Sequence, residues 1–182
     1  DSGLGTIVND DAQPTISIND VSLAEGNSGV TTFAFTVSLS NPSSLPITVN
    51  YATSNGTALA SDDDYQGTSG TLTFAPGQTA QTINVLVVGD PKFEFDETFN
   101  VNLSAPGNAT LADPSGLGTI VNDDPRPSIS IDDVSLTESN SGTTAYVFTV
   151  RLSSTSPEAI AVNFTTANGT ATTADGDYQA TS

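Results

Sequence analysis

Apolar and polar residues alternate along most of this chain, which is typical of half-buried β-strands. In Phe33–Leu39 every second side chain is large and apolar, and Ile47–Tyr51 follows the same period. The pattern continues in Thr71–Phe74, Thr82–Val88 and Thr98–Leu103, between segments rich in Gly, Pro, Asn, Asp and Ser. About seven short strands in roughly 110 residues predict an all-β fold of antiparallel, immunoglobulin-like β-sandwiches.

The chain also repeats itself with a period of 113 residues. Residues 1–69 align with residues 114–182 without a gap, and 43 of the 69 positions are identical. We therefore expect tandem sandwiches: the final strand and linker of a preceding repeat (1–11), a complete repeat (12–124) and the first half of the next repeat (125–182). Residues 12–124 are called the complete repeat below, and residues 125–182 the half-repeat. We interpret the sequence as a segment of a longer chain.

The charge of the chain is strongly one-sided. It has 21 acidic and three basic residues, a formal net charge of −18, and neither Cys nor His. Such a field repels nucleic acid and anionic membranes and attracts cations. Without His or Cys the chain lacks the commonest zinc ligands and the usual nucleophile–base pairs. We expect no nucleic-acid partner, no membrane insertion and no enzymatic activity.

The acidic residues of the complete repeat gather at strand ends and in loops. Glu25 follows the first pair of strands, Asp62–Asp64 form a second group, Gly89–Thr98 contains four more acids, and Asp123–Asp124 close the repeat. The loops of a sandwich meet at its two ends, so several of these groups are expected to converge. Converging carboxylates repel one another, and Ca²⁺, which prefers oxygen ligands from flexible loops, removes that repulsion.

An acidic loop is more often a solvated surface, and that interpretation stays the alternative. The internal repeat separates the two interpretations in part. Three acids keep their places, because Glu25, Asp62 and Asp64 recur as Glu138, Asp175 and Asp177. Asp63 becomes Gly176 and is not counted as a ligand.

Several motifs taken together resemble the Calx-beta domain. They are NGTA (Asn55–Ala58 and again Asn168–Ala171), DYQ (Asp64–Gln66), DETF (Asp96–Phe99) and IVNDD (Ile120–Asp124). The resemblance covers the complete repeat and both partial ones, and it implies a seven-stranded immunoglobulin-like sandwich. In the calcium-sensing domains of sodium–calcium exchangers, calcium lies at one tip of the sandwich, near the link to the next domain.

The resemblance also implies a set of calcium ligands. Carried over by position, these are Glu25, Asp64, Asp90, Glu94, Asp123 and Asp124, with Glu97 in the same loop and Asp62 as an additional candidate. The neighbouring repeats are expected to use Asp10 and Asp11 on one side and Glu138 and Asp177 on the other. Two departures from the family pattern, Gly89-Asp90-Pro91 and Asn122, stand where the exchanger domains have further acids. We therefore expect roughly one or two calcium ions per repeat.

These features lead to a structural function as the first hypothesis. A cation bound between the domain body and Asp123–Asp124 would stiffen the joint, and near-identical repeats in contact only with their neighbours form a rod. We expect a secreted, cell-surface or extracellular filament, matrix protein or adhesin stalk, whose partners are neighbouring repeats of the same chain. Self-association into filaments remains open.

Two other functions remain as alternatives, an adhesive module for a carbohydrate or protein and a calcium sensor. Near-copies of one repeat argue against a sensor. An adhesive module needs exposed aromatic rings, whereas the alternating positions of Phe33, Phe35, Phe74 and Phe99 predict core residues. Tyr51 and Tyr65 fit either role. The NGT sequence at Asn55 fits a glycosylation site and a turn equally well.

Overall fold

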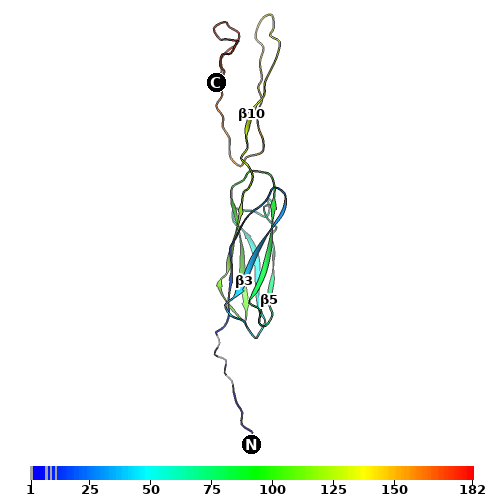
Figure 1. Cartoon of the computed structure of the whole chain (residues 1–182), viewed down its shortest axis with the longest axis vertical. Coiled ribbons are helices and arrows are strands. Elements are labelled where there is room, and N and C mark those ends of the chain that lie inside the picture. The colour runs from blue at the N-terminus through cyan, green and yellow to red at the C-terminus, as the bar shows by residue number, and fades with distance from the viewer. Residues whose placement is uncertain (1, 7, 9, 11) are drawn as a thin grey trace.

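Two β-sheets pack face to face in the computed structural model, which describes residues 2–6, 8, 10 and 12–182. The first sheet has the order β6 (Ala80–Gly89), β3 (Gly29–Leu39), β1 (Thr15–Ile18) and β8 (Thr110–Asp113). The second has the order β2 (Val21–Ala24), β9 (Ser115–Val121), β7 (Glu97–Gly107), β4 (Ile47–Asn55) and β5 (Ser69–Phe74). Figure 1 shows the resulting elongated sandwich. The described part of the chain contains no helix long and apolar enough to span a membrane.

The all-β sandwich expected from the sequence is confirmed, with nine strand segments in the complete repeat. The sequence predicted about seven strands. One of the two additional segments arises because the first strand changes sheets between β1 and β2. Two polar side chains at this crossing bond to the backbone of the neighbouring strands. Asn19 Oδ1 accepts from Thr36 N at 2.5 Å, and Asp20 Oδ1 accepts from Leu117 N at 2.7 Å. The short strand β8 is the other addition.

Most strand pairs are antiparallel, as expected, but two are parallel. They are β1 with β8 and β2 with β9. Both exceptions involve the split first strand, because its two halves join different sheets: β1 lies between β3 and β8, and β2 forms the edge of the second sheet beside β9. The parallel pairing of β2 with β9 matters for the site, because parallel strands end at the same edge of a sheet.

The core lies between the two sheets and confirms the predicted aromatic residues. The largest fully buried side chains include Phe33, Phe35, Phe74 and Phe99. Tyr65 is also buried and stacks on Phe99, with ring centroids 4.5 Å apart and the planes inclined by 15°. Each such side chain contributes about 1.5–3 kcal/mol when it is fully buried. All residues of the buried core cluster, from Ile16 to Ile120, belong to the complete repeat.

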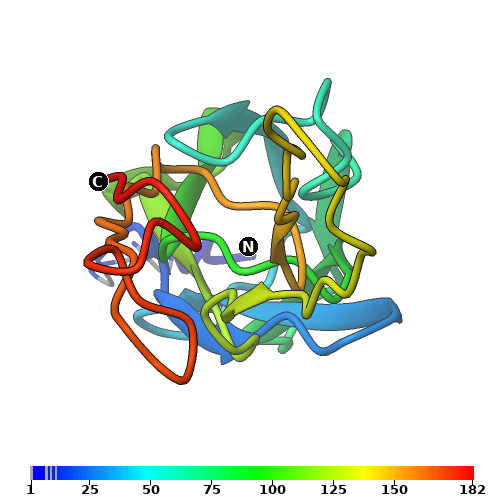
Figure 2. The ribbon, with the colours of Figure 1, turned by 90° about the horizontal axis from the view of Figure 1, so that it is seen from above.

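The half-repeat does not form a second sandwich. Its described strands are β10 (Ile129–Ile131) and β11 (Val150–Leu152), which pair as an antiparallel ribbon. Figure 2, a view along the long axis, shows its yellow and red segments on different sides of the molecule. Many apolar side chains of the half-repeat are exposed, among them Phe148, Val150 and Phe164.

Candidate metal centre

Two chain segments that are far apart in the sequence meet at one end of the sandwich. β2 and β9 run in parallel with Ala24 beside Val121, so the residues that follow each strand emerge together. Glu25 N donates to Val121 O at 3.3 Å and continues this pairing by one residue. Glu25 thus lies beside the linker residues Asp123 and Asp124, which are 98 and 99 positions later in the chain.

In the described structure Glu25, Asp123 and Asp124 form a group of three acids with the spacing of metal ligands. One carboxylate oxygen from each lies within 4.8 Å of the others. Glu25 and Asp124 are only 6% and 5% exposed, whereas Asp123 is exposed and accepts a hydrogen bond from Gly26 N at 3.2 Å. Both carboxylate oxygens of Asp124 are buried without a hydrogen-bond partner. A buried, unpaired carboxylate is unfavourable, so this group fits a bound cation.

The loop between β6 and β7 adds more carboxylates to this group. Burial raises the pKa of Glu25 to about 7, with further contributions from the carboxylates of Glu94, Asp90, Asp124 and Asp123. Burial and the neighbouring Asp90 also raise the pKa of Glu94. Burial, Asp123 and Asp90 raise the pKa of Asp124. Five of the candidate ligands therefore lie close enough for their charges to affect these pKa values, and they repel one another when all are ionised.

A second pair of acids lies next to the first group. Burial, a hydrogen bond with Asp64 and the charge of Asp64 raise the pKa of Glu97 to about 7. The charges of Glu94 and Glu25 contribute to the same shift. Glu97 begins β7 and Asp64 lies in the loop after β4, and these two antiparallel strands have Asn55 beside Phe99. Strand pairing thus carries both acids to the end of the sandwich that holds Glu25.

Lys92 is the one cation placed in this loop. Its Nζ lies 2.6 Å from Asp90 Oδ2, and its backbone N donates to Asp90 Oδ1 at 2.7 Å. Burial acts to raise the pKa of Asp90, but the hydrogen bonds and charge of Lys92 outweigh it and lower that pKa. The ion pair is largely exposed, so it is worth little by itself. A metal ion at Asp90 would compete with the Lys92 ammonium.

The other described sequence candidates do not belong to the group of Glu25, Asp123 and Asp124. Asp62 is exposed, and its Oδ1 accepts from Ser61 Oγ at 3.1 Å. Asp10 and Glu138 are exposed, and Asp11 lies outside the described residues. Asp177 is exposed and accepts from Thr172 N at 2.9 Å. The half-site expected at Glu138 and Asp177 remains a prediction.

Asn122 has a role that the sequence did not reveal. Its Oδ1 accepts from Glu94 N at 3.0 Å, and its Nδ2 donates to Asp124 O at 3.0 Å. Its own N donates to Asp96 Oδ1 at 3.1 Å. The family comparison treated Asn122 only as a lost acid. In the structure it ties the loop between β6 and β7 to the linker and so positions two candidate ligands.

Gly89, where the exchanger pattern has an acid, is required by a close approach of two chain segments. A Cβ atom at this position would lie 2.8 Å from Glu25 O and even closer to Gly26 O. These distances are too short for any side chain. The missing acid at position 89 therefore allows the end of β6 to pack directly against the segment that contains Glu25.

The donor set has the chemistry of a hard-cation site. The converging side chains are all carboxylates, come mainly from loops, and include both buried and exposed oxygens. Ca²⁺ accepts six to eight such oxygens at flexible geometry, whereas zinc and copper favour His and Cys, which the chain lacks. Glu25, Asp124, Asp123, Asp90 and Glu94 would form one site, and Asp64 and Glu97 would extend it.

Comparison with known proteins gives relatives of two kinds. Extracellular matrix protein 3 of Lytechinus variegatus is 38% identical over 80 residues, which cover 42% of this chain and 3% of that protein. Sodium/calcium exchanger 1 of Canis lupus familiaris is 41% identical over 69 residues, which cover 38% of this chain and 7% of the exchanger. The chain thus corresponds to a small part of each of these proteins.

Solved structures agree with the fold. The apo form of the Calx CBD1 domain matches with a TM-score of 0.56 and 29% identity over 62% of this chain and all of that domain. The calcium binding domain CBD12 of CALX1.1 matches with a TM-score of 0.56 and 29% identity over 68% of this chain and 53% of that one. The model of the Calx-beta domain matches residues 9–125 and again residues 122–182. Together the two matches span nearly the whole sequence, and the chain belongs to the Calx-beta domain family.

Proposed function

We propose that this chain is a calcium-binding structural repeat of an extracellular filament, matrix protein or adhesin stalk. In this proposal calcium binds at the end of the complete repeat and stiffens the joint to the next repeat. The observation that carries it is the buried carboxylate of Asp124, whose two oxygens lack a hydrogen-bond partner. Asp124 belongs to the linker and lies beside Glu25 of the domain body, so a cation between them joins the two parts.

The arrangement of the chain supports a rod. The N-terminal segment and the half-repeat leave the complete repeat at opposite ends of its long axis (Figure 1). Repeats connected in this way contact only their neighbours, so the length of an assembly changes by adding repeats. The likeness to an extracellular matrix protein supports an extracellular location, and the likeness to calcium-binding CBD12 supports calcium as the ion.

The test is calorimetric titration with Ca²⁺, together with thermal unfolding in excess chelator and in millimolar calcium. Binding at a hundredfold excess over the dissociation constant stabilises the folded state by about 2.7 kcal/mol. This corresponds to a rise in Tm of roughly 10–20 °C for a domain of about 100 residues, in which each kcal/mol shifts Tm by about 4–8 °C. Mg²⁺ is the control ion, because it demands a tighter octahedral geometry than these loops provide.

Asp124→Asn gives the sharpest variant for this test. In chelator it removes an unpaired buried charge, so the Tm is expected to rise. In calcium it removes a ligand, so the affinity is expected to fall. The matched control is Asp113→Asn at an exposed acid away from the group. A titration without calcium binding, or an equal effect of both variants, would reject the proposal.

The adhesive alternative has less support. The four phenylalanines that the sequence assigned to the core are buried, and so is Tyr65. Tyr51 is partly buried and packs against the core. The sensor alternative is supported by the likeness to sodium/calcium exchanger 1. A sensor would require a separate partner that responds to the calcium-dependent change at the joint.

A further inference from the structure

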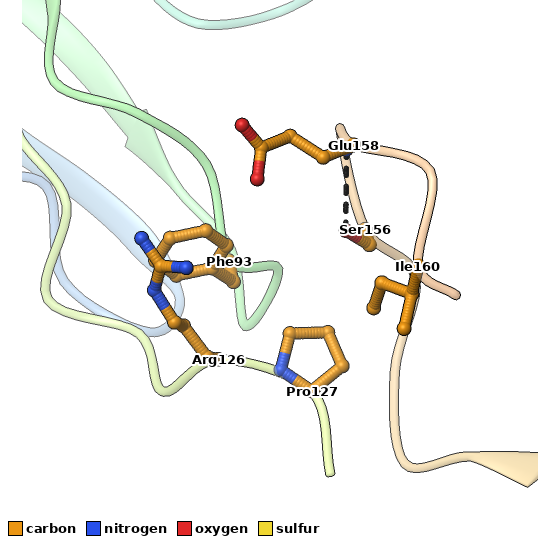
Figure 3. Close-up of a pocket in the computed structure, with 6 residues that line it drawn as sticks. All are labelled: Phe93, Arg126, Pro127, Ser156, Glu158 and Ile160. Carbon is orange, nitrogen blue, oxygen red and sulfur yellow. Dashed lines mark hydrogen bonds between the residues drawn. The ribbon is translucent and has the colours of Figure 1, made fainter. Parts of the chain in front are cut away.

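A second contact crosses the joint between the complete repeat and the half-repeat. Phe93, in the loop between β6 and β7, lies under the guanidinium of Arg126, whose Cζ is 4.9 Å from the ring centroid. Figure 3 shows the ring, Arg126 and Pro127 facing the segment of the half-repeat that contains Ile160. They enclose a cavity of about 110 Å³ lined by Phe93, Arg126, Pro127, Ser156, Glu158 and Ile160.

The chemistry of this contact differs from that of the acidic group. The ring of Phe93, Pro127 and Ile160 supply apolar surface, and a guanidinium over a ring face is attracted by the ring quadrupole. Arg126 is also one of only three basic residues in a chain of net charge −18. By its chemistry this contact needs no metal ion, in contrast to the carboxylates, which repel one another until a cation binds.

A hollow at the equivalent place, with Gln13 where the first has Arg126, lies at the other end of the complete repeat. Subtracting the period of 113 residues converts Arg126, Pro127, Ser156 and Glu158 into Gln13, Pro14, Ser43 and Leu45. These four residues line a cavity of about 300 Å³ together with Ala12, Asn41, Pro42, Ser44 and Asn108. Leu45 there is 58% exposed. The hollow is therefore a property of the repeat and forms in a fully folded sandwich as well as in the half-repeat.

We propose that the N-terminal end of the repeat is a socket for the Phe93 loop of a second copy of the repeat. The ring of Phe93 enters the socket formed around Pro127 and holds the angle between the two repeats without an ion. This inference does not depend on the calcium site, although both use the same loop. Phe93 lies between the candidate ligands Asp90 and Glu94, so ion binding would order the loop that carries the ring.

The experiment measures the angle of the joint in the whole chain. The sequence has no cysteine, so spin labels can be attached at Asn84→Cys on β6 and Ser130→Cys on β10, two exposed positions on either side of the joint. Double electron–electron resonance then gives the distribution of distances between the labels. With excess chelator we expect a narrow distribution for the parent chain and a broad one for Phe93→Ala.

Phe95→Ala is the matched control. Phe95 belongs to the same loop and packs edge-on against Phe93, with ring centroids 6.0 Å apart, but it is 49% exposed and does not line the cavity. It is expected to leave the distribution narrow, as is Phe93→Tyr, which keeps the ring. Circular dichroism checks that each variant retains its sandwich. A broad distribution for the parent chain in chelator, or equal distributions for the two alanine variants, would overturn the proposal.

The calcium proposal and the socket proposal can fail independently of each other. If the distance distribution of the parent chain is broad in chelator and narrows with calcium, the ion alone fixes the joint and the socket proposal is wrong. If the distribution is narrow in chelator and the chain does not bind calcium, the socket proposal stands and the calcium proposal is wrong.

Discussion

The first half of the complete repeat and the half-repeat share more than half of their aligned residues, yet they adopt two different structures. Phe35 and Phe148 occupy equivalent positions, yet Phe35 is fully buried whereas Phe148 is 51% exposed. Val37 and Val150 differ in the same way. The residues are the same, so the difference comes from their partners. In the complete repeat β7 and β9 supply the facing surface, and the positions 113 residues after these two strands lie beyond residue 182.

Short-range structure is the same in both regions. Tyr65 donates its hydroxyl to Asn55 Oδ1 at 2.6 Å, and Tyr178 does the same to Asn168 at 2.7 Å. Each of these asparagines also accepts a hydrogen bond from the backbone five residues later. The NGT sequence is therefore part of a structured turn, which supports the turn interpretation over a glycosylation site.

The aspartates that precede the two tyrosines also make equivalent local hydrogen bonds in both regions. Asp64 accepts a hydrogen bond from Leu59 N at 2.7 Å, and Asp177 accepts one from Thr172 N at 2.9 Å. Loops that bond within themselves form without the rest of the sandwich, whereas strands need a neighbour and a facing sheet. The recurrence of Asp64 as Asp177 is thus explained by loop closure before any metal is considered.

Removing a core ring should show the largest difference between the two regions. Phe99 contacts the rings of Phe33, Phe35 and Tyr65, so Phe99→Ala is expected to cost about 3–5 kcal/mol of stability. Phe148→Ala removes an exposed ring and should change the free energy of unfolding by less than about 0.5 kcal/mol. Urea denaturation measures both. Similar losses would mean that the half-repeat has a packed core in solution.

The pH dependence should come from the acidic group of the complete repeat. The pKa of Glu25 is raised in the folded state to about 7 from 4.5, so the folded state binds more protons between these values. In chelator, stability should therefore fall as the pH rises from 5 to 8, by roughly 1–3 kcal/mol. Calcium should remove this dependence, and Glu25→Gln should reduce it. The control Glu138→Gln, at the exposed equivalent position, should leave it unchanged.

The shared tyrosine hydrogen bond should matter for global stability in one region only. Tyr65→Phe leaves the buried ring in place and removes a bond to Asn55, which should cost about 0.5–1.5 kcal/mol. Tyr178→Phe removes the same bond outside the folded core, and thermal unfolding should show no shift. An equal shift in both variants would contradict the separation between local and global structure.

Lys92 should have the smallest effect, and on calcium affinity more than on stability. Lys92→Gln removes the ammonium that pairs with Asp90, so a cation no longer competes with it. We expect calcium to bind up to about fivefold more tightly, because an exposed ion pair is worth up to about 1 kcal/mol. Calorimetric titration measures the change. Weaker binding would show that Lys92 positions Asp90 for the ion.

The sequence alone determined the strands, the buried rings and the family. Alternating apolar positions identify β3, β4 and β6 because one face of each strand is buried, and this period can be read without knowing the partner. The acids Glu25, Asp90, Glu94, Asp123 and Asp124 were found through the resemblance to the Calx-beta domain, and the structure places them together. Their role as ligands is the proposal to be tested.

Only the tertiary structure decided how these residues meet. The change of sheet at Asn19 and Asp20 allows β2 to run parallel to β9, which brings Glu25 to the linker. The hydrogen bonds of Asn122 connect the linker to the loop between β6 and β7, and the cavity beside Phe93 lies between that loop and the half-repeat. No pattern of apolar and polar positions in the sequence indicates that these segments meet. Alternation encodes which face of a strand is buried, but strand order and long-range polar contacts depend on the packing of the whole sandwich.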